Sequence, residues 1–273
     1  GVHLACEQAS NLLTKVLEWG RLMSYLEQST RYIAYDTRLG GRYRYYRPPA
    51  VLKSELATRY VAEMDRMFSG YSALIPGLTE FFRTQTPKRE ADSDFIYRQA
   101  IKAKALDSIR GMLPAASISN LGIYGTGQAY EALLLRMRTH PLPEAQAYSD
   151  MMLTELRKVI PSFLRRVDIE DRGIATSNYF ETNHGAMSDI ASSIFGDTEP
   201  EPAPGVRLLD FDPEGEAKVV AAALYPHTML PEDQVMRRVH AMSVEERVAI
   251  LRAYCGERTN RRHRPGRALE RPF

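Results

Sequence analysis

A chain of 273 residues is long enough for one large domain or two ordinary ones. Its composition, 44% hydrophobic and 26% charged, is that of a globular protein and excludes a disordered chain. The formal net charge of +2 is close to neutral, so bulk electrostatics select neither nucleic acid nor a membrane surface as a partner.

The cysteines and the hydropathy pattern bear on the compartment. Cys6 and Cys255 lie far apart, and they give neither a disulfide framework nor a metal-binding pattern. No apolar run reaches the length of a membrane span, and no signal peptide is recognisable. We therefore expect a reducing, cytoplasmic location. Both termini interrupt a pattern, so we also expect the chain to be part of a longer one.

Helical periodicity dominates the N-terminal half. Apolar residues at helical spacing predict amphipathic helices over residues 4–28, 51–69 and 97–109. Between the first two, Gly40 and Gly41 separate β-rich runs, which predicts a hairpin. Pro76-Gly77 is expected to interrupt the chain after the second helix.

The C-terminal half mixes short strands with helices. Strands are predicted over residues 118–124 and 206–212, and helices over residues 128–138, 145–159, 217–224 and 244–254. Residues 196–205 are rich in proline and acid and predict a linker. The expected fold class is α+β, helix-rich with a small β-sheet or hairpin. It is divided into a domain at 1–195, the linker, and a second domain opening at 206–273.

Residues 25–36, YLEQSTRYIAYD, break the apolar pattern with polar side chains. If the helix continues, Glu27 and Arg31 form an i,i+4 surface ion pair worth roughly a few tenths of a kcal/mol. If the chain extends, Glu27, Ser29 and Arg31 point to the same side. Such a set suits a phosphorylated ligand, because Arg binds phosphate through two hydrogen bonds and Glu accepts from a sugar hydroxyl.

The same stretch resembles the flavin-dependent thymidylate synthases. Their signature reads Arg-His-Arg, two residues, Ser, one residue, Asn-Glu, one residue, Ser, one residue, Arg-Tyr. It falls without gaps on WGRLMSYLEQSTRY, residues 19–32. The matching residues are Arg21, Ser24, Glu27, Ser29, Arg31 and Tyr32. Trp19, Gly20 and Leu26 depart from it, in place of the first Arg, the His and the Asn.

Two further elements of the family follow in order. SIRGMLP matches an Ala-Arg, two-residue, Leu-Pro element through Arg110. GQAYEALLLRMRTHPLPEAQ matches a helix that ends in Leu-Arg, through Arg138, followed by Ala-Gln after a longer spacer. Gly127, Ala129 and Leu133 replace polar residues that are usual in that helix. The resemblance covers most of residues 1–167.

A weak repeat extends the resemblance to the C-terminus. HRPGRALERP, residues 263–272, shares Arg, Leu and Glu with GRLMSYLEQS, residues 20–29, at matching offsets. Arg262, His263 and Arg264 restore the triplet that the first copy lacks, whereas the serines are absent. The chain is therefore interpreted as a diverged tandem member of the family, with one copy and the opening of a second.

The resemblance implies a function and a set of site residues. It implies reductive methylation of dUMP to dTMP with methylenetetrahydrofolate, NADPH and FAD, in homo-oligomers, typically tetramers, or a tandem-copy pseudo-oligomer with shared active sites. The residues implied to bind dUMP are Glu27, Gln28, Ser29, Thr30, Arg31, Arg110 and Arg138, with Arg138 also catalytic. The residues implied to bind FAD are Arg21, Glu27, Arg262, His263 and Arg264. We hypothesise that the first copy supplies the dUMP half of a site and the second copy the FAD half.

Other interpretations remain open. In one alternative, the first copy is inactive by itself. In another, it is a degenerate structural or nucleotide-binding domain, because a fold can persist after its active site has been lost. The arginine cluster of residues 258–271, or the tyrosines of residues 41–49, bind RNA in a less favoured alternative. His184 has no partner at metal-ligand spacing and is read as a loop histidine, His140 receives no role, and Trp19 is read as core. No metal and no membrane partner are expected.

Overall fold

The computed structural model describes residues 1–200, 205–260 and 263–270. The chain divides into two compact units, residues 1–197 and 198–273. The elements of the first unit are β1 (Val2–Ser10), α1 (Asn11–Leu17), β2 (Met23–Glu27), α2 (Pro49–Leu52), α3 (Ala57–Gln85), α4 (Asp94–Ile109), a 3₁₀ turn (Arg110–Met112), β3 (Ile118–Gly125), α5 (Gly127–Arg138), α6 (Pro143–Arg157), a π-helical turn (Glu170–Ile174) and α7 (Ala175–Phe195). The elements of the second are α8 (Gly215–Leu224), α9 (Glu232–His240), α10 (Val244–Cys255) and 3₁₀ turns at Tyr225–His227 and Arg267–Glu270. The helix-rich α+β prediction is confirmed.

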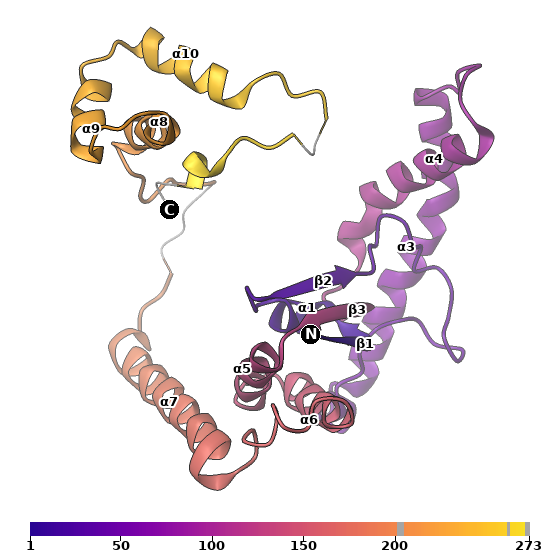
Figure 1. The fold of residues 1–273 in the computed structure, drawn as a ribbon. Coiled ribbons are helices and arrows are strands. Elements are labelled where there is room, and N and C mark those ends of the chain that lie inside the picture. Colours follow the sequence, from indigo (N-terminus) through magenta and orange to yellow (C-terminus); the bar gives the residue numbers. More distant parts are fainter. Residues whose placement is uncertain (201–204, 261–262, 271–273) are drawn as a thin grey trace. The chain divides into compact units, whose positions relative to one another are not determined.

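A three-stranded antiparallel sheet organises the first unit, with β3 between β1 and β2 (Figure 1). The predicted helix over residues 4–28 is therefore wrong. Only α1 is helical there, where Leu13 and Leu17 share one buried face and the Ser10 hydroxyl caps the helix by accepting from the Leu13 N–H at 3.1 Å. The flanking segments satisfy their backbone groups through β3 instead.

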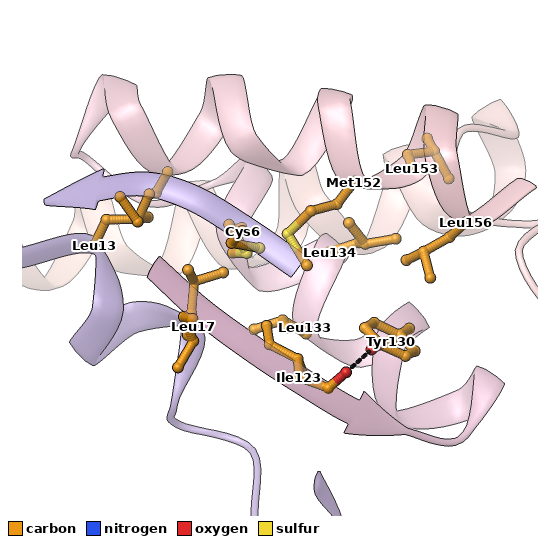
Figure 2. Packing of buried hydrophobic residues seen from close by; sticks show 14 of the residues in the cluster. Cys6, Leu13, Leu17, Ile123, Tyr130, Leu133, Leu134, Met152, Leu153 and Leu156 are labelled. Atoms are coloured by element: carbon orange, nitrogen blue, oxygen red, sulfur yellow. Dashed lines mark hydrogen bonds between the residues drawn. The ribbon is translucent and has the colours of Figure 1, made fainter. Parts of the chain in front are cut away.

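The main core lies between the sheet and helices α1, α5 and α6 (Figure 2). Ile123 of the central strand meets Leu133 and Leu134 of α5 and Met152 of α6 in this cluster. The Tyr130 hydroxyl is buried and donates to the Ile123 carbonyl at 3.0 Å, so it is satisfied inside the apolar layer. The predictions of β3, α5 and α6 are confirmed within a few residues at their ends.

A second cluster packs tyrosines of the segment before α2 against α3 and α4. Gly40 and Gly41 have φ of +56° and +78° and close a tight turn, with a single bridge from Leu39 to Arg42. The predicted hairpin is correct in this turn but wrong in its strands. The reason is that Tyr45 and its neighbours bury their rings against Phe68 instead of alternating across a ladder.

Three further predictions need correction. Helix α3 continues through Pro76, which is exposed, so that water can satisfy the carbonyl that the proline leaves unbonded. Residues 206–212 form no strand, and Leu209 and Phe211 there are 87% and 69% exposed. His184 lies within helix α7, a helix that the sequence analysis did not predict, and not in a loop.

The second unit has its own small core. Val220 and Ala221 of α8 pack against Val235 and Val239 of α9, a helix also missed by sequence, and α8 and α10 agree with their predicted ranges to within a few residues. A capping box at Ser243 and Glu246 begins α10. Within the described ranges, no helix combines the length and the apolar character needed to cross a lipid bilayer.

Candidate functional site

The segment with the family signature runs from a turn through β2 and into a second turn. Tyr25 of β2 donates its hydroxyl to the Gly20 carbonyl at 2.8 Å, which fixes the first turn against the strand. Trp19, at the start of the turn, is 69% exposed, so its reading as a core residue is wrong. Glu27 ends β2 and pairs with Lys15 at 3.5 Å and not with Arg31, as the surface-pair interpretation required.

Residues 28–31 lie beside the start of β3. The Gln28 N–H donates to the Asn120 carbonyl at 3.0 Å, which holds the backbone to the sheet. The Ser29 carbonyl then accepts from the N–H groups of Tyr32 and Ile33, at 3.2 and 3.3 Å, so the chain turns back there. The predicted extended strand is therefore also wrong. Thr30 and the exposed Arg31 lie within this turn.

Arg110 lies on a different element, the 3₁₀ turn that follows α4. Its side chain is about half exposed, and its Nε donates to Asp107 Oδ1 at 3.0 Å. The pair is the ordinary i,i+3 arrangement of an exposed helix end, and it leaves the other guanidinium nitrogens free to bind an anion.

Arg138 is the last residue of α5 and is only partly exposed. Its Nη1 is buried and has no hydrogen-bond partner among the described residues. An unpaired buried guanidinium N–H is costly, so it marks a position where a ligand would restore a lost interaction. Asp168 lies close enough for Arg138 to help depress its pKa, although a hydrogen bond from Arg157 is the larger cause.

The residues predicted to bind dUMP lie in three separate parts of the first unit. Glu27 to Arg31 are contiguous, whereas Arg110 and Arg138 lie on separate elements, and none of the hydrogen bonds and ion pairs found among the described residues joins these three groups. Whether they converge around dUMP between neighbouring copies stays a prediction.

Of the residues implied to bind FAD, Arg21 lines a small cavity of the first unit, whereas Glu27, His263 and Arg264 do not line it, so that assignment stays a prediction. The cavity has a volume of about 230 Å³ and lies between the turn before β2 and one face of α5. Its lining includes Arg21 together with Gly20, Ala129 and Leu133, which are three of the positions where this chain departs from the family pattern. Gly20 lies in one family motif, and Ala129 and Leu133 lie in another. The fold places all three around one small, largely apolar cavity.

The same cavity does not fit FAD as a complete site. Ligand pockets commonly span about 300–1,000 Å³ and contain placed polar groups, and this one is smaller. A longer side chain at Gly20 would also be tightly confined, because a Cβ there lies 2.9 Å from the Tyr25 hydroxyl. This cavity alone is therefore too small for a whole flavin, although Arg21, Gln128 and Arg136 give it polar lining.

Arg136 is a site residue that the sequence analysis missed. Its guanidinium lies over the Trp19 ring, 4.5 Å from the centroid, and burial lowers its pKa. It lines the small cavity and also a larger neighbouring one, and Ala132 lines both as well. The signal in the sequence was its position two residues before Arg138, but the pairing with Trp19 depends on the tertiary fold.

The triplet assigned to the second copy lies in the second unit. Arg262 lies outside the described residues. The His263 ring accepts or donates at Nε2 to the Asn260 side chain at 2.8 Å, and the His263 carbonyl accepts from Arg258 Nε at 2.7 Å. Arg264 is exposed. The His263 side chain is thus already held within its own loop.

The two cysteines are both free and differ in burial. Cys6 is buried in the main core, and this burial raises its pKa to about 11, so its thiol stays protonated at neutral pH. Cys255 ends α10 and is exposed. Across the ranges that the structure describes, no cluster of three histidine, cysteine or acidic side chains is arranged to hold a metal ion.

The sequence of this chain matches one family model and several relatives. A family model described as thymidylate synthase complementing protein matches residues 1–162. A UPF0159 protein of Chlamydia pneumoniae is 36% identical over 272 residues, covering 99% of this chain and 51% of the relative. A UPF0159 protein of Thermoplasma acidophilum is 29% identical over 294 residues, covering 98% and 56%. The chain spans about half the length of the curated relatives it matches.

Proposed function

This chain belongs to the thymidylate synthase complementing protein family, and from that membership we propose that it acts in the FAD-dependent synthesis of dTMP. The reaction is the reductive methylation of dUMP. Methylenetetrahydrofolate supplies the one-carbon unit, and NADPH supplies reducing equivalents through the flavin, which carries the redox chemistry when bound. The residues of this chain contribute binding, orientation and charge.

The nucleotide half of the site is assigned to this chain. The observation that supports it most directly is the buried, unpartnered Nη1 of Arg138. A guanidinium held in a partly buried place stabilises negative charge that develops on a pyrimidine ring, so no thiol nucleophile is required. The Ser29 hydroxyl and the exposed Arg31 guanidinium are assigned to the phosphate, for which Arg offers two parallel hydrogen bonds.

The flavin half is assigned to the second copy. Glycine, alanine and leucine at positions 20, 129 and 133 stand where the family carries polar residues, so the first unit has lost three of the side chains that such a cofactor would contact. The triplet of Arg262, His263 and Arg264 retains the residue types of the family signature. A protein in which one copy binds dUMP and the other binds FAD accounts for both sets of departures.

Replacing Arg138 by alanine is expected to weaken dUMP binding by about tenfold to a hundredfold, because one charge-assisted hydrogen bond is lost. Calorimetric titration of the 273-residue chain with dUMP measures this effect. The matched control is Arg83→Ala, since Arg83 is an exposed arginine of α3 that pairs only with Glu80 in the first unit. Equal affinity in both variants would contradict the assignment of Arg138.

Changing Arg262, His263 and Arg264 together to alanine is expected to remove bound flavin from the full-length protein, because the cavity lined by Arg21 in the first unit is too small to hold flavin by itself. The absorbance of the purified protein near the flavin bands provides the measurement. Retention of flavin at the wild-type stoichiometry would count against the division of labour between the copies.

A catalytically degenerate first copy is the second candidate. The replacements at positions 20, 129 and 133 favour it, because a fold persists after its site has decayed. The two candidates differ in one measurement, since a degenerate copy would show no saturable binding of dUMP even in the wild-type chain.

A further inference from the structure

A second, larger cavity lies beside helix α5 and is not used by the proposed reaction. It has a volume of about 590 Å³, which is within the usual range for small-ligand pockets. Its lining includes Arg136, Thr139, His140, Pro141, Phe180 and His184. No carboxylate of the described residues lines it, so all its ionisable groups are cationic or become cationic on protonation.

Arg136 supplies the permanent charge. Its guanidinium carbon lies over the Trp19 ring, 4.5 Å from the centroid, a cation–π contact that uses none of its N–H groups as conventional hydrogen-bond donors. Burial is the larger influence on its pKa, and among the described groups only Tyr25 acts in the opposite direction. None of the ion pairs found among the described residues includes Arg136.

His140 is oriented by its own loop. Its Nδ1 accepts a hydrogen bond from the Leu142 N–H at 3.1 Å, so the neutral ring carries its proton on Nε2. Burial, and then the positive charges of Arg136 and His184, lower the pKa of His140. Burial and the Arg136 charge both disfavour the protonated ring, and an anion that enters beside His140 would make its protonation easier.

His184 comes from a different element, helix α7. Phe180 precedes it by one helical turn, so the two side chains share a face of α7, and both line the cavity. Basic side chains from α5, from the loop after α5 and from α7 thus line one cavity, with the Phe180 ring beside them. Arg136 and His140 lie about 40 residues before Phe180 and His184 in the sequence, so helix periodicity alone cannot bring the two pairs together.

We propose that this cavity binds a compact polyanion, a diphosphate or polycarboxylate group, with Phe180 beside any ring that the ligand carries. Arg136 and His184 supply charge, and His140 donates from Nε2. The proposal does not rest on dTMP synthesis, because it concerns a cavity that none of the residues assigned to dUMP lines.

The test is calorimetric titration of the flavin-free 273-residue chain with inorganic pyrophosphate and, separately, with citrate. We expect saturable binding of at least one, weakened about tenfold by His184→Ala and further by His184→Glu, which reverses the charge. His184 is exposed, so these variants keep the fold. His227→Ala, an exposed histidine of the second unit, is the matched control and should bind like wild type.

Nuclear magnetic resonance of the histidine rings gives a second readout. Bound anion is expected to raise the pKa of His140 relative to the free chain, which a purely structural histidine would not show. Preference for pyrophosphate would assign a phosphorylated ligand, and preference for citrate a polycarboxylate. Absence of saturable binding by both, or equal binding by the His184→Ala and wild-type chains, would overturn the proposal.

Discussion

Replacing Glu144 by alanine is expected to lower the free energy of unfolding of the first unit by about 2–4 kcal/mol. Glu144 is only 2% exposed and lies in the first turn of α6. Its Oε1 accepts from the Ser10 N–H at 2.9 Å, and its Oε2 accepts from the Ser10 hydroxyl at 2.5 Å. Without the carboxylate, both Ser10 donors lose their partner in a buried place, at the junction of β1 and α1.

Chemical denaturation followed by circular dichroism measures this loss. Glu181→Ala is the matched control, because Glu181 is an exposed acid of α7, and its change is expected to stay within about 0.5 kcal/mol. If Glu144→Ala were as stable as this control, the Ser10 contact would contribute nothing to the fold.

The glutamine variant separates charge from hydrogen bonding at the same position. Burial raises the pKa of Glu144 above its ordinary value of 4.5, more than the hydrogen bonds from Ser10 lower it. A raised folded pKa means that the folded state holds the proton more tightly, so stability is lost as pH rises above 4.5 through that pKa. Glu144→Gln cannot titrate, so the stability of wild type relative to this variant is expected to fall with rising pH. A pH-independent difference would contradict the burial argument.

Replacing Gly173 by alanine is expected to destabilise the first unit by about 3 kcal/mol. Gly173 is buried in the π-helical turn before α7, and a Cβ there would lie 2.0 Å from the Val167 carbonyl oxygen. The Gly173 N–H donates to the Arg166 carbonyl at 3.0 Å, so the backbone cannot move away without losing this bond. The clash is with backbone atoms, which cannot relax as a side chain would.

Gly185→Ala is the matched control for this effect. Gly185 lies within α7, and a Cβ there meets nothing within 4 Å. Alanine favours a helix over glycine by about 1 kcal/mol, so this variant is expected to be slightly more stable than wild type. Denaturation curves of both variants measure the contrast. If both substitutions changed the free energy of unfolding by similar amounts, the backbone around Gly173 would be able to accommodate a Cβ without loss of stability.

A consequence of the Gly173 change concerns the cationic cavity. Phe180 and His184 reach this cavity from α7, and the π-helical turn connects α7 to the loop after α6. A shift of that turn would move both side chains relative to Arg136. Pyrophosphate is therefore expected to bind more weakly to Gly173→Ala than to Gly185→Ala, since only the first substitution displaces the turn that positions α7.

Local patterns determined β3, α5 and α6 of the first unit but not α7. The alternation in residues 118–125 and the apolar periodicity of α5 and α6 each point to one structure, and Thr126 caps α5 by accepting from the Ala129 N–H at 3.2 Å. The apolar spacing of residues 4–28 is compatible with one long helix and also with the observed strand, short helix and strand. Pairing of both strands with β3 decided between them, and β3 lies far along the chain.

The candidate site divides in the same way. The residue order of Glu27, Ser29, Arg31, Arg110 and Arg138 by itself determined the family, because the motif requires those residue types at fixed intervals. Tertiary structure alone decided that residues 28–31 form a turn, that Gly20, Ala129 and Leu133 surround one cavity, and that Arg136 stacks on Trp19. These side chains come from distant segments and meet only when the sheet packs against α5, so the spacing of residues within one segment cannot predict the contact.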